Sequence, residues 1–191
     1  MLANRAAPQR AHGVANRVRI IGGQYRRRLL DFPDADGLRP TPDRVRETLF
    51  NWLGQDLPGW TCLDLFAGSG ALGFEAASRG AARVIMIERD ARAIRALEHN
   101  RVTLGASQLD ILRVDALAWL ANNRETFDLI FIDPPFDSGL AAPVLADLAR
   151  HLKPGGHAYV EQGSAVVAPP GLIIHRSGRA GRSHFALLIK E

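Results

Sequence analysis

From Trp60 to the C-terminus, short apolar runs alternate with segments in which apolar residues recur every three or four positions. This alternation indicates a parallel sheet covered by helices on both faces. The last two strands have no clear helix between them, which predicts one antiparallel strand. The predicted strands are 61–66, 82–87, 109–114, 127–132, 157–161, 172–175 and 184–190, and the predicted helices are 71–79, 91–104, 116–121 and 140–151.

The first 58 residues follow a different pattern. Residues 1–16 show no apolar period and are predicted to be a disordered basic tail. Two short strands, 18–22 and 25–30, flank Gly22-Gly23-Gln24, which reads as a hairpin turn. A helix follows Pro40, with Thr41 as its expected N-cap and Pro42 as its first residue. We therefore expect three parts: a tail at 1–16, a hairpin and helix appendage at 17–58, and one α/β domain at 59–191.

Composition narrows the class of protein. Hydrophobic residues make up 47% of the 191 residues, enough for a sizeable core. No apolar run approaches the roughly 18 residues that span a membrane, and no signal-peptide core is present, so we expect a cytoplasmic protein with no membrane partner. The single cysteine, Cys62, excludes an intramolecular disulfide and a multi-cysteine zinc site. It lies within a strand, and we expect it in the core.

The net charge is +4, and its distribution is uneven. Residues 1–30 contain seven arginines and no acid. A one-signed arm of this kind favours contact with a phosphate backbone, although a solvated tail would have the same composition.

A glycine loop follows the first strand of the α/β domain. Residues 64–73, DLFAGSGALG, contain G-x-G-x-x-G between a strand and a helix. Such a loop brings backbone close to a ligand, and by itself it fits NAD(P), FAD or S-adenosylmethionine (SAM). The motif alone therefore leaves the cofactor open.

Three acids at strand ends narrow this choice. Asp64 precedes the loop, where a carboxylate would repel a pyrophosphate but suit a cationic sulfonium with an α-amino group. Glu88 ends the next strand, where an acid accepts hydrogen bonds from ribose hydroxyls. Asp115 follows the third strand, and we expect it to accept from an adenine amino group or to cap the next helix. This set favours SAM.

Asp133-Pro134-Pro135-Phe136 directly follows the buried strand 127–132. The two prolines remove N–H donors, which leaves the Asp133 carboxylate and the Pro134 carbonyl as acceptors. Two acceptors would orient an exocyclic amino group whose lone pair is otherwise delocalised into a heteroaromatic ring. Phe136 would stack on that base, which must leave its helix to reach the site. The segment therefore predicts methylation of a base amino group, without a metal.

The chain resembles the bacterial 16S rRNA guanine-N2 methyltransferases of the small subunit, which act at position 966. The resemblance covers about residue 17 to the C-terminus. It rests on residues 19–26 (RIIGGQYR), 38–53 (LRPTPDRVRETLFNWL), 64–73, Ile87-Glu88 and 133–136. It implies a Rossmann-like SAM-dependent methyltransferase sheet, mostly parallel with one antiparallel strand, plus a small N-terminal β-hairpin and helix.

The resemblance also implies site residues and partners. Its substrate would be 16S rRNA within small-subunit assembly particles, and we expect a monomer. The catalytic set is Asp133, Pro134, Pro135 and Phe136. The expected SAM-binding residues are Thr41, Asp64, Ala67, Gly68, Ser69, Gly70, Glu88, Arg89, Asp115 and Ala116. The expected RNA-binding residues are Arg19, Arg26, Arg27, Arg28, Arg39 and Arg44.

Other functions share some of these features. An adenine-N6 DNA methyltransferase or a glutamine-N5 protein methyltransferase uses a similar Pro-Pro-aromatic segment. An NAD-dependent oxidoreductase would explain the glycine loop but not residues 133–136. A silent RNA-binding module would not need the three acids. Arg179, Arg182 and His184 gather near the C-terminus, where they would touch RNA or lie in a solvated loop.

Overall fold

The computed structural model describes residues 16–34, 40–136 and 138–191. It contains a two-stranded antiparallel sheet, β1-β2, and a seven-stranded sheet in the order β5-β4-β3-β6-β7-β9-β8. The strands are β1 Asn16–Arg19, β2 Leu29–Phe32, β3 Thr61–Asp64, β4 Arg83–Glu88, β5 Leu109–Arg113, β6 Phe127–Ile132, β7 Leu152–Gln162, β8 Leu172–Ala180 and β9 Ser183–Lys190. The helices are α1 Asp43–Trp52, α2 Ala71–Ser78, α3 Ala91–Leu104, α4 Ala116–Asn122, α5 Ala141–Ala146 and the 3-10 helix η1 Leu148–His151.

The large sheet is mostly parallel. Strands β5, β4, β3, β6 and β7 pair in parallel, whereas β9 is antiparallel to both of its neighbours, β7 and β8. The predicted parallel sheet with one antiparallel strand is therefore confirmed. Because parallel strands end at the same edge, the residues that follow β3, β4, β5 and β6 meet there.

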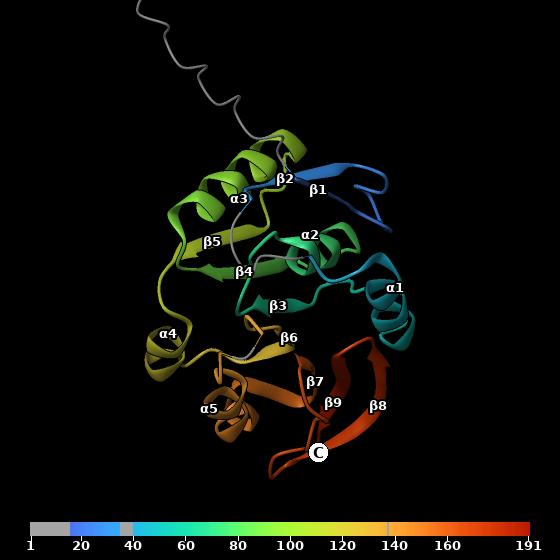
Figure 1. The fold of residues 1–191 in the computed structure, drawn as a ribbon, viewed down its shortest axis with the longest axis vertical. Coiled ribbons are helices and arrows are strands. Elements are labelled where there is room, and N and C mark those ends of the chain that lie inside the picture. Colours follow the sequence, from blue (N-terminus) through green and yellow to red (C-terminus); the bar gives the residue numbers. More distant parts are fainter. Residues whose placement is uncertain (1–15, 35–39, 137) are drawn as a thin grey trace, which may run out of the picture.

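Residues of each strand alternate between two cores. On one face, Cys62, Met86 and Phe131 pack with α1, α2, α3 and the β1-β2 hairpin. On the other face, Leu63, Ile85 and related residues pack with α4, α5 and η1. Figure 1 shows α1 and α2 on one side of the sheet and α4 and α5 on the other. Cys62 is fully buried, as expected, and burial raises the pKa of its thiol. Among the described helices, none has the length and apolar character needed to cross a membrane.

The N-terminal hairpin differs from its prediction. Gly22-Gly23-Gln24 does not join the two strands directly: β1 ends at Arg19, β2 begins only at Leu29, and the Gly23 carbonyl accepts from the Arg26 N–H in a turn within the connecting loop. The glycines instead lie against the C-terminal end of α2, where a Cβ on Gly23 would stand 1.8 Å from the Ser78 carbonyl oxygen. Gly23 also has φ +71°. Close backbone contact, rather than a hairpin turn, explains this glycine pair.

The start of α1 also differs. Pro42, not Thr41, occupies the N-cap position, and no side chain caps this helix. The Thr41 hydroxyl donates instead to Asp133 Oδ2 at 3.0 Å. A tertiary partner has displaced the local capping role that the sequence favoured.

Three elements near the C-terminus have other boundaries in the structure than the sequence predicted. The predicted helix 140–151 is divided at Asp147, whose φ of −122° is not helical. Strand β7 begins at Leu152, since Gly155 and Gly156 lie in an irregular stretch of the strand rather than in a preceding turn. Strand β8 continues to Ala180 and joins β9 through a two-residue turn. Gly178 permits this, because a Cβ there would stand 2.6 Å from the Phe185 ring.

The three-part division predicted from the sequence stays a prediction. Strand β1 begins at Asn16, the last residue assigned to the tail, and residues 1–15 lie outside the described part of the chain. The β1-β2 hairpin and α1 share one hydrophobic core with α2 and the large sheet.

Candidate functional site

A pocket of about 860 Å³ opens at the edge where β3, β4, β5 and β6 end. We call it the acidic pocket, because among the described residues six carboxylate residues line it against three arginines. The acids are Asp64, Glu88, Asp90, Asp115, Asp133 and Glu161, and the arginines are Arg89, Arg92 and Arg182. The excess of carboxylates makes the pocket suited to a cationic ligand.

The three glycines of the loop have different roles. Gly68 lines the pocket, and its N–H donates to Glu88 Oε2 at 2.9 Å. Gly70 is the N-cap of α2 with φ +81°, and a Cβ there would stand 2.6 Å from Leu97. Gly73 lets α2 approach β4, since its Cβ would stand 2.9 Å from Met86. Only the first of these glycines therefore faces the pocket.

Asp64 is buried at the base of the pocket. Its Oδ2 accepts from the Gly73 N–H at 3.0 Å, in the first turn of α2. Burial, opposed by that hydrogen bond and reinforced by the charge of Glu88, raises the pKa of Asp64 to about 7. A buried carboxylate with a pKa near neutrality is stabilised in its charged form by a neighbouring cation.

Backbone N–H groups hold the acids that follow β4 and β5. Glu88 Oε1 accepts from the N–H groups of Arg89 and Asp90 at 2.7 and 2.8 Å. Asp115 is the N-cap of α4, and its Oδ1 accepts from the Ala118 N–H at 3.0 Å. The expectation that Asp115 caps a helix is confirmed, and its place in the pocket wall is compatible with contact to a ligand.

Asp133 also lines the pocket, directly after β6, which pairs with the β3 strand that carries Asp64. Burial raises its pKa well above the ordinary value, and the charge of Glu161 adds to this, while the Thr41 hydrogen bond opposes it. Pro134 and Pro135 follow in the pocket wall, and Phe136 is 48% exposed at its border. The segment therefore combines a half-buried acceptor with an exposed aromatic face, an arrangement compatible with a base amino group.

Glu161, near the end of β7, is a site residue that sequence reasoning missed. Its two carboxylate oxygens accept from Tyr159 Oη at 2.7 Å and from Ser183 Oγ at 2.6 Å. Burial, together with the charge of Glu161, raises the pKa of Tyr159 well above its ordinary value. Glu161 thus fixes the start of β9 beside the pocket. Its only sequence signal is an acid within an apolar strand.

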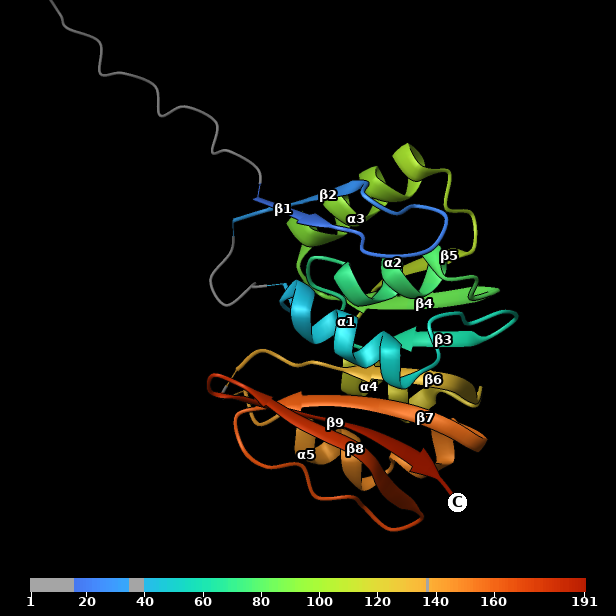
Figure 2. The ribbon, with the colours of Figure 1, turned by 90° about the vertical axis from the view of Figure 1, so that its right-hand side faces the viewer.

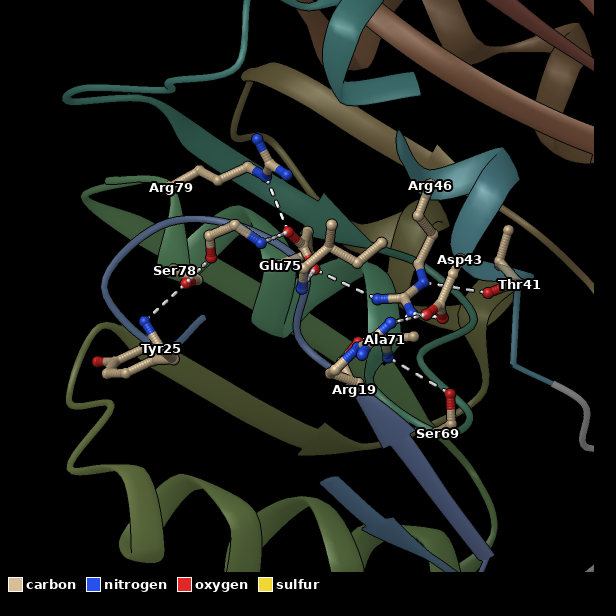
Figure 3. Close-up of polar contacts among 12 residues, drawn as sticks. Arg19, Tyr25, Thr41, Asp43, Arg46, Ser69, Ala71, Glu75, Ser78 and Arg79 are labelled. Atoms are coloured by element: carbon tan, nitrogen blue, oxygen red, sulfur yellow. Dashed lines mark hydrogen bonds and ion pairs between the residues drawn. The ribbon is translucent and has the colours of Figure 1, made fainter. Parts of the chain in front are cut away.

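A buried cluster of ion pairs holds the backbone at Thr41 in place (Figure 3). Arg46 and Glu75 are fully buried and pair at 3.2 Å, and Arg79 pairs with the other oxygen of Glu75 at 2.9 Å. Glu75 also accepts from the N–H groups of Ile21 and Gly22. Arg46 Nε donates to the Thr41 carbonyl at 3.1 Å. The cluster joins the loop between β1 and β2 to α1 and α2. It also fixes the backbone of Thr41, whose side chain bonds to Asp133.

The structure brings most predicted site residues together. All four catalytic candidates line the acidic pocket, and so do nine of the ten SAM-binding candidates, with Gly70 as the exception. Arg44 is exposed on the first turn of α1, two residues from the pocket-lining Pro42. Arg39 lies outside the described residues.

The other arginine candidates do not line the pocket. Arg19 pairs with Asp43 at 3.1 Å. Arg26, Arg27 and Arg28 are exposed on a loop that contacts Ser78, the last residue of α2, whereas the first residue of α2 lines the pocket. Figure 2 shows this blue loop at the opposite edge of the sheet from the ends of β3 and β7.

The sheet order, glycine loop and acidic edge define the class: a Rossmann-like methyltransferase fold. A solved putative methyltransferase from Escherichia coli superposes with a TM-score of 0.83 at 40% identity, covering 92% of this chain and 99% of that one.

The family described as Conserved hypothetical protein 95 matches residues 18–189. Ribosomal RNA small subunit methyltransferase D from Escherichia coli is 40% identical over 185 residues, 94% of this chain and 93% of that protein. The Haemophilus influenzae protein of the same name is 45% identical over 150 residues, 75% of this chain and 78% of that protein. The chain therefore belongs to this family of small-subunit ribosomal RNA methyltransferases. The resemblance inferred from the sequence motifs is confirmed.

Proposed function

We propose that this protein transfers a methyl group from SAM to the exocyclic N2 of a guanine in 16S rRNA. The expected target is position 966 in assembling small subunits in the cytoplasm, and the protein is expected to act as a monomer. The observation that carries the proposal is Asp133: a half-buried acceptor in an acidic pocket, held by Thr41 and followed by an exposed aromatic ring. The names of the relatives support the same substrate.

The chemistry of the pocket fits SAM. A sulfonium with an α-amino group is cationic, and the carboxylates of Asp64 and Glu88 would face it. The pKa of Asp64 is raised to about 7, so a cation beside it would relieve the cost of its ionisation. Glu88 and Asp115, at the ends of β4 and β5, would hold the ribose hydroxyls and the adenine amino group. When bound, SAM supplies an electrophilic methyl group.

Asp133 and Pro134 would orient the amino group. Thr41 occupies Asp133 Oδ2, which leaves Oδ1 and the Pro134 carbonyl as the acceptors for the two N–H bonds of guanine N2. Pro134 and Pro135 offer no N–H that would compete for these acceptors. With both N–H bonds held, the nitrogen lone pair is directed toward the methyl donor. Phe136 would stack on the purine ring.

Asp133 would also take the proton. Transfer would form the N–C bond and break the methyl–sulfur bond of SAM, which leaves as the neutral thioether, and the amino nitrogen, now acidic, must lose one proton. Its N–H already points at the Asp133 carboxylate, whose pKa is raised by burial and by the charge of Glu161. A raised pKa makes this carboxylate a better proton acceptor than an ordinary aspartate.

The test is a methyl-transfer assay with labelled SAM. The substrate is small-subunit particles from cells that lack the protein, and mass spectrometry identifies the labelled nucleoside. We expect N2-methylguanosine at one site. Label in DNA adenine or in protein glutamine would support the alternative substrates and contradict this one. Absence of label in all three would contradict the proposed activity.

A further inference from the structure

A second hollow adjoins the acidic pocket on the other side of Phe136. Its volume is about 550 Å³, and it shares Pro134, Pro135, Phe136, Leu140 and Arg182 with the pocket. We call it the basic groove. Its charged or titratable lining residues, among those that the structure describes, are Arg179, Arg182 and His184.

The β8-β9 hairpin builds the basic groove. Arg179 pairs in register with His184, and His184 pairs in register with Gln162 at the end of β7. The turn between the strands consists of Gly181 and Arg182, with Gly181 at φ +59°. The buried hydrogen bond from Ser183 to Glu161 anchors this turn to the wall of the acidic pocket. Arg182 is thereby held between the two hollows rather than on a freely moving tip.

The two hollows differ in charge. Six carboxylates line the acidic pocket, whereas none of the described residues lining the basic groove is an acid; Asp137 lies outside the described residues. Arg179 and Arg182 are exposed, and within the described part of the chain neither forms an ion pair. A polymer with one negative charge per nucleotide is repelled by the pocket and attracted to the groove.

The position of the groove also fits an RNA strand. A base that leaves its helix to reach Phe136 brings its own flanking phosphates to within one nucleotide of that ring. Those phosphates must therefore lie beside Phe136. The loop that carries Arg26 and Arg27 is at the other edge of the sheet and does not meet this requirement (Figure 2).

We propose that the RNA strand flanking the target guanine binds in the basic groove, with its phosphates on Arg179 and Arg182. This inference rests on the proposed function, because it requires that the base at Phe136 belongs to RNA. It assigns the phosphate contacts to the C-terminal hairpin rather than to the N-terminal arginines.

The test compares two double variants with the same loss of charge. R179A/R182A removes the groove arginines, and R26A/R27A removes two exposed arginines at the opposite edge. We measure the KM for small-subunit particles with labelled SAM at several salt concentrations, and the binding of fluorescently labelled 16S rRNA. The second readout does not depend on turnover. A thermal melt checks folding, and calorimetry measures SAM affinity.

For R179A/R182A we expect a rise in the KM for particles of roughly tenfold or more, with weaker rRNA binding. The slope of log affinity against log salt should become shallower by about one to two. SAM affinity should stay within about threefold, because removing a cation does not weaken a site for a cation. R179A alone, which lies outside the acidic pocket, should give about half of the slope change. R26A/R27A should stay within about twofold of wild type.

If the wild type methylates particles and R179A/R182A has an unchanged KM and salt slope, the proposed RNA contact in the basic groove is contradicted and the proposed function stands. The same holds if R26A/R27A carries the loss instead. If the wild type methylates protein or DNA but not particles, the proposed function is contradicted. If, in addition, all variants bind rRNA equally well, the proposed RNA contact in the basic groove is contradicted too.

Discussion

The acidic pocket and the basic groove meet at Phe136 and have opposite charge. Carboxylates at the ends of successive parallel strands line the first, and arginines of an antiparallel hairpin line the second. A methyltransferase acting on nucleic acid must bind a cationic donor and a polyanionic substrate within a few ångströms of each other. This fold separates the two requirements by drawing them from different parts of one sheet edge.

The largest expected effect is the loss of turnover when Asp133 is replaced, at the place where the acidic pocket meets the basic groove. D133A should lower kcat by about 10²–10³-fold, because it removes the acceptor that orients and deprotonates the amino group. SAM affinity should change little. D133N is the matched control: it keeps a partner for Thr41 but cannot take the proton, so we expect a similar loss. Calorimetry and single-turnover rates measure the two quantities, and an equal collapse of SAM binding would contradict the role of Asp133.

D64N should weaken the binding of SAM in the acidic pocket without changing the binding of RNA. Replacing this buried carboxylate by a neutral amide should weaken SAM binding by roughly tenfold or more, with the KM for particles unchanged. Calorimetry with SAM measures the first and the particle assay the second. Retained SAM affinity would mean that the charge of Asp64 does not face the donor.

The same variant should become more stable in the absence of ligand. Burial raises the pKa of Asp64 to about 7, so the folded protein binds this proton more tightly than the unfolded chain does. Stability therefore falls as the pH rises from about 4 to about 7, and D64N should remove that loss. We expect D64N to exceed wild type by roughly 1–3 kcal/mol at pH 8 and to match it more closely near pH 4. Denaturant unfolding at the two pH values tests this.

T41V tests whether Thr41, from the N-terminal appendage, positions Asp133. Loss of the hydrogen bond to Asp133 should lower kcat by about five- to tenfold, in line with one lost hydrogen bond of about 1 kcal/mol or slightly more. T41S, which keeps the hydroxyl, is the control and should retain most activity. A T41V enzyme as fast as T41S would show that Thr41 does not position Asp133.

The smallest expected effect is a shift in pH dependence. Activity requires ionised Asp133, so kcat/KM should fall as the pH drops through its raised pKa. The charge of Glu161 contributes to that rise, and E161Q should therefore move the acidic limb to lower pH. S183A, which removes one hydrogen-bond partner of Glu161 but no charge, should leave the limb in place. A limb that does not move in E161Q would contradict the electrostatic coupling.

The acidic pocket could be predicted from the sequence, whereas for the basic groove only its charged residues, Arg179, Arg182 and His184, could be marked as candidates for RNA contact. Asp64, Glu88, Asp115 and Asp133 each follow an apolar run, and parallel strands bring such positions to one edge. Residues 177–182 contain two glycines and two arginines and have the composition of a loop, so the extension of β8 and its turn were missed. The register that places Arg179 beside His184 comes only from pairing with β9.

Tertiary contacts also changed two local interpretations. Thr41 and the pair Gly22-Gly23 were assigned to local structures, an N-cap and a turn, that their residue types favour. Their actual partners, Asp133 and Ser78, lie more than fifty residues away along the chain. The buried partners Arg46 and Glu75 were equally invisible, since charged residues in helical patterns are expected on the surface.

The most direct test is a crystal structure of the protein with S-adenosylhomocysteine and guanosine monophosphate. We expect the adenosyl group in the acidic pocket beside Glu88 and Asp115. We also expect the guanine ring on Phe136 with N2 toward Asp133, and the phosphate on the side of Arg179 and Arg182. A nucleotide phosphate within the acidic pocket, or guanine bound away from Phe136, would contradict the division of charge on which the account depends.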